Sequence, residues 1–122
     1  MKNAKQEFLA SILKPGEQYA GIILGKDGQP DHHLILLPGE AKNVNWEDAK
    51  KFASEAGGEL PTRREQSLLY ANLKEAFKPE WYWSGDQREA GSAWDQDFGN
   101  GNQCWDYTDD KCRARAVRSV AI

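Results

Sequence analysis

The sequence predicts an α+β domain in which two helices pack on short antiparallel sheets. With 122 residues, the chain has the length of one compact domain. Two amphipathic helical segments follow one another in its middle, between residues 45 and 76. After residue 77 the chain changes to short aromatic or β-branched runs separated by Gly, Asn and Asp. Helices and strands that occur in separate runs indicate an α+β fold.

The first part of the chain is expected to form a short helix and a β-hairpin. Apolar residues at helical spacing predict an amphipathic helix over residues 4–13, which stops before Pro15. Residues 18–25 and the run HHLILLPG are rich in β-formers and flank the turn sequence KDGQPD, so they predict a hairpin. His32 and His33 begin its second strand, and adjacent strand residues point to opposite faces.

Two capped helices are expected next. The first begins after Asn45, whose side chain can cap a helix, and ends at Gly57–Gly58, where glycine permits left-handed backbone. Its expected apolar face is Trp46, Ala49, Phe52, Ala53 and Ala56. The second begins at the capping box of Thr62 and Glu65 and runs to about residue 75. Its apolar stripe is Leu68, Leu69, Leu73 and Ala76.

Strands are expected in the runs EWYWSG, SAWDQDF, QCWDY and ARAVRSV. Alternation in the second run sends Trp94 and Phe98, with Gln96, to one face and Asp95 and Asp97 to the other. If Trp94 and Phe98 belong to the core, the two aspartates face solvent or a partner. The following Gly and Asn residues tolerate positive φ, which indicates a tight reversal into the next strand.

Charge and hydropathy bound the class of partner. A net charge of −3 supplies no strong basic field, so we expect no nucleic-acid partner. No stretch reaches the roughly 20 apolar residues of a membrane helix, so we expect no membrane partner. The first residues lack the apolar core and cleavage site of a secretory signal, which predicts synthesis in the cytoplasm.

Several of these motifs resemble a family of bacterial and phage domains with a C-type-lectin-like fold, a family that includes the C-terminal domain of a bacterial collagen-like adhesin. The resemblance covers roughly residues 16–120. It rests on Leu60-Pro61-Thr62 with Glu65, Tyr82-Trp83-Ser84, Trp94 with Phe98 and Asn100-Gly101, and the closing Arg115-Ala116-Val117-Arg118.

The resemblance implies adjacent N- and C-terminal strands, with the first hairpin beside the last strand and a long loop region displayed away from them. It divides the chain into an N-terminal helical segment, residues 1–15, and a C-type-lectin-like domain, residues 16–122. Ala116 stands where the family often has a cysteine. The chain also lacks the calcium-binding triplet of sugar-binding animal lectins, so the resemblance gives no support for calcium-dependent sugar binding.

The segment from Gly85 to Cys112 is the candidate binding face, because its aromatic, amide and carboxylate side chains suit adaptable recognition. The alternative is that the polar residues are the solvent side of an ordinary hairpin and the tryptophans are core. Trp105 is the sharpest candidate, because it follows the turn in a polar run. The expected contact residues are Asp86, Gln87, Arg88, Asp95, Asp97, Asn100, Asn102, Trp105, Asp106, Tyr107, Asp109 and Asp110.

No metal or other cofactor is expected. Asp106, Asp109 and Asp110 lack the spacing of a calcium loop, so a solvated acidic loop is the simpler interpretation. The two cysteines, Cys104 and Cys112, are far in sequence from both histidines. Reduced thiols and a disulfide between them both remain open.

Basic residues gather at the end of the chain, in KCRARAVRS. Arg113 and Arg115 share a strand face, and we expect them to pair with nearby aspartates rather than to bind phosphate.

The sequence holds no Ser-His-Asp set, phosphate-binding loop, dinucleotide fingerprint or zinc-protease motif, so we expect a protein that is not an enzyme. The expected function is noncatalytic recognition by a phage- or prophage-encoded module that binds a host protein or a cell-surface glycan through residues 85–112. A virion component and a free intracellular inhibitor of a bacterial protein both remain open. The other alternative is a copper-dependent oxidase of the formylglycine-generating type that uses Cys104 and Cys112. The N-terminal helix could serve homo-oligomerisation, because its apolar face has no mate in the family core.

Overall fold

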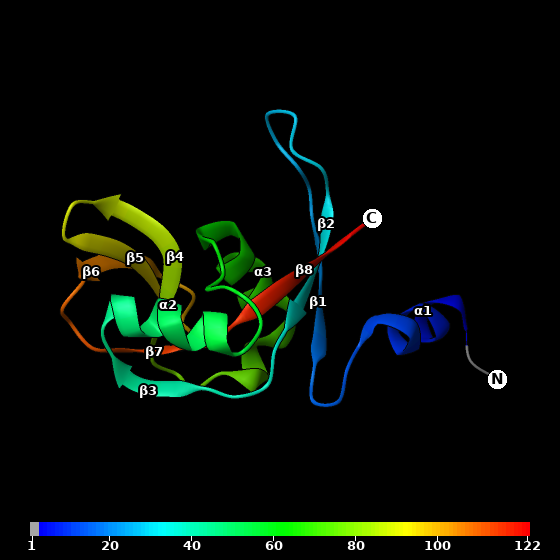
Figure 1. The fold of residues 1–122 in the computed structure, drawn as a ribbon, viewed down its shortest axis with the longest axis horizontal. Coiled ribbons are helices and arrows are strands. Elements are labelled where there is room, and N and C mark those ends of the chain that lie inside the picture. Colours follow the sequence, from blue (N-terminus) through cyan, green and yellow to red (C-terminus); the bar gives the residue numbers. More distant parts are fainter. Residues whose placement is uncertain (1–2) are drawn as a thin grey trace.

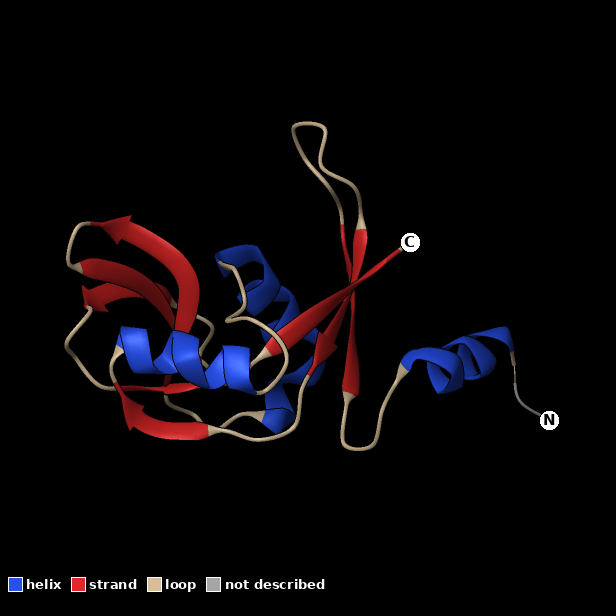
Figure 2. Ribbon diagram, in the orientation of Figure 1, coloured by secondary structure: helices blue, strands red, loops and turns tan. Residues whose placement is uncertain are grey.

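The computed structural model describes residues 3–122 and confirms an α+β fold with two sheets (Figures 1 and 2). The smaller sheet holds β1 (Gln18–Ile23), β2 (His32–Leu36) and β8 (Val117–Ala121). The larger sheet holds β3 (Ala41–Val44), β4 (Trp81–Glu89), β5 (Ser92–Asp97), β6 (Gln103–Tyr107) and β7 (Cys112–Ala114). The helices are α1 (Ala4–Ile12), α2 (Trp46–Glu55) and α3 (Arg63–Leu73), the last extended by a 3₁₀ turn, Lys74–Ala76.

The smaller sheet joins the two ends of the chain. Its order is β1-β2-β8, and β2 runs antiparallel to both neighbours. Leu36 of β2 is paired with Gln18 on one side and Val117 on the other. The N- and C-terminal strands therefore share a sheet, as the resemblance implied. The turn between β1 and β2 extends well beyond the sheet (Figure 1).

The larger sheet has the order β3-β7-β4-β5-β6, so β6 is an edge strand. Its pairs are antiparallel except β4 with β7, which are parallel. Strand β3 was not expected from the sequence. Only Ala41 and Val44 pair with β7, and Asn43 between them has a φ of 53°. Pairing with β7 stabilises this short, irregular strand, and the local sequence carries no pattern that predicts a strand there.

The predicted caps are present. The Asn45 side chain accepts a hydrogen bond from the backbone N–H of Asp48 at 2.8 Å. Thr62 and Glu65 form the full reciprocal capping box, with bonds of 2.9 and 3.1 Å. Gly57, at a φ of 92°, follows the end of α2. One helical prediction is wrong: Ala56 is exposed, because α2 ends one residue before it.

Two buried indoles connect the helical part of the chain to the larger sheet. Trp46 opens α2 and donates its Nε1–H to the backbone oxygen of Ser84 in β4, at 2.8 Å. Trp83 in β4 donates its Nε1–H to the oxygen of Val44 in β3, also at 2.8 Å. Both rings belong to the same core cluster, beneath α2. These two bonds satisfy both indoles inside the core and fix α2 and β3 against β4.

The two histidines point to opposite faces of β2, as expected. His33 is buried and lies 2.9 Å from the Tyr19 hydroxyl through its Nδ1. His32 lies on the other face, with its Nε2 2.8 Å from the Glu65 carboxylate. The capping box of α3 is thereby tied to the smaller sheet.

Helix α1 stands apart from the rest of the fold and lies beside the smaller sheet (Figure 1). None of its residues is buried. The Phe8 ring nevertheless lies 4.8 Å from the His33 ring, and Arg118 of β8 donates to the Ile12 oxygen at 2.7 Å. Arg118 also forms a two-pronged ion pair with Glu17. The apolar side of α1 therefore packs in part against β2 of the same chain.

Trp83→Phe tests the indole connection. The change removes the donor to Val44 and leaves a small cavity, so we expect a loss of at least about 2 kcal/mol of folding free energy. Urea unfolding measures the loss. Trp81→Phe is the matched control, because Trp81 is 37% exposed and should change stability by no more than about 0.5 kcal/mol. Equal effects of the two variants would contradict the assignment.

Candidate functional site

Strands β5 and β6 form a ribbon whose two faces differ in chemistry. Trp94 is paired directly with Trp105, and Asp95 is paired with Cys104. Directly paired residues project to the same face, and neighbours along a strand alternate. One face of the ribbon therefore carries tryptophans, and the other carries acids and a thiol.

The tryptophan side forms a layer that we call the aromatic face: Arg63, Arg88, Trp94, Trp105 and Tyr107. The Arg63 guanidinium lies 3.6 Å from the centre of the Trp94 ring, and that of Arg88 lies 4.0 Å from the Trp105 ring. The rings of Trp105 and Tyr107 meet edge to face at 5.6 Å. Tyr107 is 60% exposed and Trp105 is partly exposed. Cations on indole faces attract the ring quadrupole, which orders these long side chains.

Contacts with α3 hold the aromatic face in place. Arg63 is the first residue of α3, and its backbone N–H donates to the Asp86 carboxylate of β4 at 2.9 Å. Its Nε donates to Gln103 of β6 at 3.1 Å, and the Gln103 amide returns a bond to the Arg63 oxygen at 2.8 Å. The capping box that starts α3 thus also sets where Arg63 meets the ribbon.

The other face carries what we call the acid–thiol cluster: Asp95, Asp106 and Cys112. One potential ligand atom from each lies within 4.8 Å of the others. Asp95 is fully buried, and its Oδ2 accepts a hydrogen bond from the Cys112 thiol at 3.6 Å. The expectation that Asp95 faces solvent or a partner is wrong. Residues on both faces of β5 are buried, Ser92 and Gln96 on one and Ala93 and Asp95 on the other, whereas the alternation argument assumes one open face.

Burial controls the protonation of this cluster. Desolvation raises the pKa of Asp95 to about 8, and the neighbouring Asp106 carboxyl adds to the shift. Desolvation and the nearby Asp95 carboxylate raise the pKa of the Cys112 thiol as well. The cluster therefore holds protons at neutral pH that an exposed aspartate would have lost.

The remaining expected contact residues occupy turns or open surface. Asp97 accepts a bond from the Gly99 N–H at 2.7 Å, and Asn100 accepts one from the Asn102 N–H at 2.9 Å. These bonds shape the β5–β6 turn. Asp110 accepts a bond from the Tyr107 N–H at 3.1 Å and closes the next turn.

Gln87 and Asp109 are exposed on the surface. The structure thus brings Arg88, Trp105 and Tyr107 together on one face and places Asp95 and Asp106 on the other. The twelve residues expected from the sequence do not form one surface.

Neither cysteine forms a disulfide in residues 3–122: Cys104 is exposed and Cys112 is buried. The arginines differ from expectation in their partners. Arg113 pairs with Glu40 at 2.9 Å and with Glu80, not with the nearby aspartates. Arg115 donates to two backbone oxygens, at 2.7 Å each, and has no acidic partner in the described part of the chain.

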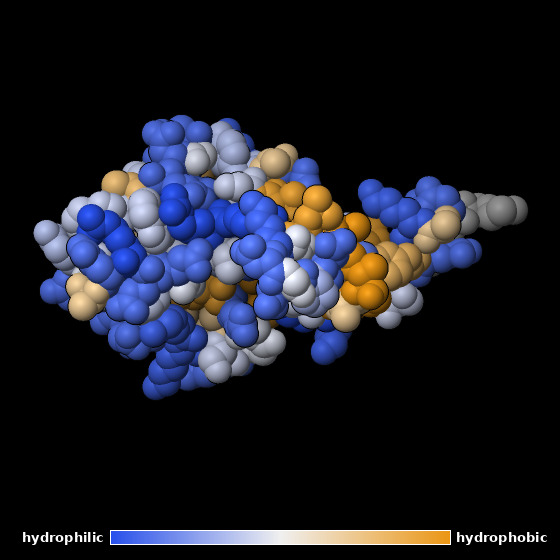
Figure 3. Space-filling model, turned by 90° about the horizontal axis from the view of Figure 1, so that it is seen from above, coloured by the Kyte–Doolittle hydropathy of each residue, from blue (hydrophilic) through white to orange (hydrophobic). Residues whose placement is uncertain are grey.

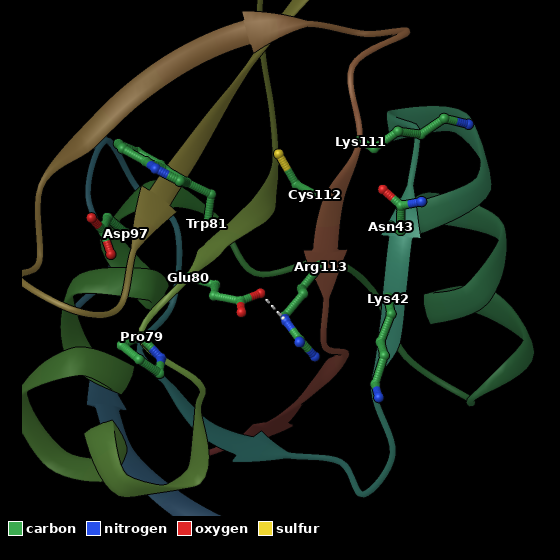
Figure 4. A pocket seen from close by; sticks show the side chains of 9 residues that line it. All are labelled: Lys42, Asn43, Pro79, Glu80, Trp81, Asp97, Lys111, Cys112 and Arg113. Atoms are coloured by element: carbon green, nitrogen blue, oxygen red, sulfur yellow. Dashed lines mark hydrogen bonds and ion pairs between the residues drawn. The ribbon is translucent and has the colours of Figure 1, made fainter.

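A cavity of about 510 Å³ opens between β3, β4 and β7 (Figure 4). The Glu80–Arg113 ion pair lies within it, and Lys42 lines it from β3. Cys112 reaches this cavity, so the acid–thiol cluster lies close to its wall. Sequence reasoning missed Lys42 because β3 itself was not expected.

No known protein family model matches the chain, and no curated protein matches it. No helix in residues 3–122 has the length and apolar character needed to cross a membrane.

Asp95→Asn tests the buried carboxyl in metal-free buffer. Folding must keep a proton on Asp95 that the unfolded chain, with a pKa near 3.8, releases as the pH rises. The wild type should therefore lose stability between about pH 4 and pH 8, whereas Asp95→Asn carries no such penalty. We expect the variant to be more stable at pH 7.5 by at least about 1.4 kcal/mol, the value of one pKa unit.

Thermal unfolding at several pH values measures the difference, which should disappear below about pH 4. Asp109→Asn, at an exposed position, is the control and should follow the wild type. A stability difference between wild type and Asp95→Asn that stays constant with pH would contradict the assignment.

Proposed function

We propose that the protein is a noncatalytic recognition module that binds a partner protein through the aromatic face. The observation that carries the proposal is the ordered layer that Arg88 of β4 forms with Trp105 and Tyr107 of the edge strand β6, with Tyr107 60% exposed. Arginine, tryptophan and tyrosine are the residue types that dominate binding energy at protein interfaces. Here they are already held in one geometry, so little side-chain entropy remains to be lost on binding.

The position of Arg88 favours a protein partner over a glycan. Sugars commonly stack on an open aromatic ring, but the Arg88 guanidinium lies 4.0 Å above the Trp105 ring. A glycan would have to displace this contact. A protein can instead contact the exposed Tyr107 and pair an acidic or carbonyl group with Arg88. It can also reach the unpaired edge of β6.

We also propose that the fold is C-type-lectin-like and that the domain is phage- or prophage-encoded. The shared sheet of β1 and β8, the capped α3 and the long β4–β7 region support this proposal. A virion-borne binder of a host surface protein and a free intracellular inhibitor of a bacterial protein would both use the aromatic face. They differ in where the partner is found.

The cysteine-dependent oxidase gains little support from the fold. Cys104 is exposed, Cys112 is buried, and the potential metal ligands near Cys112 are two aspartates rather than the second thiol. A copper-dependent oxidase of this type needs two thiols close enough to bind one Cu(I) ion.

Pull-down from bacterial lysate and from cell-envelope fractions tests the recognition proposal. The bait is the wild-type chain, and the captured protein is then purified and titrated. We expect Tyr107→Ala and Trp105→Ala each to weaken its binding by at least about tenfold, because both remove interface anchors. Trp81→Ala is the control, since Trp81 is an exposed tryptophan outside the aromatic face.

Equal binding by wild type and both variants would exclude the aromatic face as the contact surface. Tryptophan fluorescence that responds to sugars, and loses the response in Trp105→Ala, would identify a glycan partner and contradict the choice of a protein.

Self-association through α1 is a second proposal, because apolar residues gather where α1 meets the smaller sheet. Figure 3 shows hydrophobic side chains between α1 and the body of the domain. Phe8 is 38% exposed and Ile22 is 46% exposed. The Phe8 ring contacts the His33 ring, and Ile22 of β1 is paired with His33 of β2. Light scattering should show a dimer for the wild type and a monomer for Phe8→Glu. A monomeric wild type would end this proposal, and Glu7→Gln is the control.

A further inference from the structure

Three strands bring ligating atoms together at the acid–thiol cluster. Asp95 comes from the central strand β5, Asp106 from the edge strand β6 and Cys112 from β7. Their ligating atoms all lie within 4.8 Å of one another. The chain passes through two turns between the first and the last of them, so no short sequence motif marks the group.

One atom of the cluster lacks a partner. Asp95 is fully buried, yet its Oδ1 accepts no hydrogen bond. Of the four such buried side-chain atoms in residues 3–122, it is the one carboxylate oxygen. Ser92 Oγ on the same strand also lacks a partner, whereas Gln96 donates to the Gln66 backbone oxygen at 2.8 Å. A buried acceptor without a donor destabilises the fold, and a bound cation would remove that penalty.

The distances suit a small tetrahedral ion. Bonds of about 2.3 Å to sulfur and 2.0 Å to oxygen at tetrahedral angles place the two ligand atoms about 3.5 Å apart. The Cys112 Sγ lies 3.6 Å from the Asp95 Oδ2, close to this separation. The donor set also selects the metal. Calcium and magnesium bind all-oxygen sites, whereas a thiolate with carboxylates suits zinc.

We propose that Asp95, Asp106 and Cys112 form a zinc-binding site that links strands β5, β6 and β7. The ion takes one sulfur and two carboxylate oxygens, and Asp106, which is only partly buried, leaves a side open for a solvent ligand. Zinc binds thiolate and carboxylate, so the protons held by the cluster pass to solvent on binding. Cys104 is exposed and does not belong to the group, although it is paired with Asp95 in the sheet.

This site is independent of the proposed recognition function. It lies on the side of the ribbon opposite Trp105 and Tyr107. A bound ion would fix strands β5 and β6 to β7. Zinc uptake and partner binding can therefore succeed or fail separately.

Titration of the tag-free, reduced, chelator-treated protein with zinc chloride tests the site. We expect one zinc per chain by calorimetry and a higher melting temperature in the zinc-loaded protein. Cadmium should give the ultraviolet charge-transfer band of a metal thiolate. Cys112→Ser and Asp95→Asn should weaken zinc binding by roughly a hundredfold or more. Cys104→Ser and Asp109→Asn are the matched controls and should bind zinc like the wild type.

Two outcomes would overturn the proposal. One is a reduced wild type that gives no binding heat, no thermal shift and no cadmium band. The other is a cadmium band that survives Cys112→Ser but is lost in Cys104→Ser, which would show an adventitious surface site. If Cys112→Ser fails to fold, Cys104→Ser still decides the question, because Cys112 is then the one thiol left in the chain.

Discussion

The structure depends on two indole hydrogen bonds that join β4 to the neighbouring elements β3 and α2. Trp46 bonds from α2 to β4, and Trp83 bonds from β4 to β3. Together they place a helix and a short strand against the same strand of the larger sheet. Because the indoles lie under α2, one side of the sheet is closed by the core. The opposite side of the β5–β6 ribbon is closed only in part, by α3.

This division explains why one ribbon carries two kinds of site. On the closed side, Asp95 meets Cys112 in low dielectric, where an unneutralised charge is costly. On the other side, Trp105 and Tyr107 stay in contact with solvent and are ordered by Arg88. Because the core packs against the acid–thiol side of the β5–β6 ribbon, the aromatic face on the other side can be rigid and still contact solvent. The same backbone thus joins a candidate ion site to a candidate interface.

Local signals were sufficient for the parts of the fold that depend on near neighbours. The Thr62–Glu65 box, the Asn45 cap and the first hairpin could be predicted because each involves residues close in sequence. Strand β3 and the burial of Asp95 could not, because both depend on β7, which lies far along the chain. Alternation itself held at Asp95, which lies on the face opposite Trp94, but alternation cannot tell which faces of a strand the rest of the chain will cover.

The candidate site followed the same pattern. Trp105 and Tyr107 could be selected by residue type and position after a turn, but Arg63 could not, because its partner Trp94 comes from a distant strand. The sequence favoured the carboxylates as contact residues only because they are polar. In the structure they lie in turns, on the open surface and in the acid–thiol cluster. Composition indicates which side chains can bind, and the pairing register of the strands decides which of them share a face.

Hydrogen exchange of the five indole N–H groups tests the central claim most directly. In residues 3–122, only Trp46 and Trp83 donate their indole N–H to a protein acceptor. In a two-dimensional ¹H–¹⁵N spectrum after transfer to deuterium oxide, the account predicts that the signals of these two indoles persist and that the Trp105 signal is lost quickly. A protected Trp105 indole, or a Trp83 indole that exchanges as fast as Trp105, would contradict it.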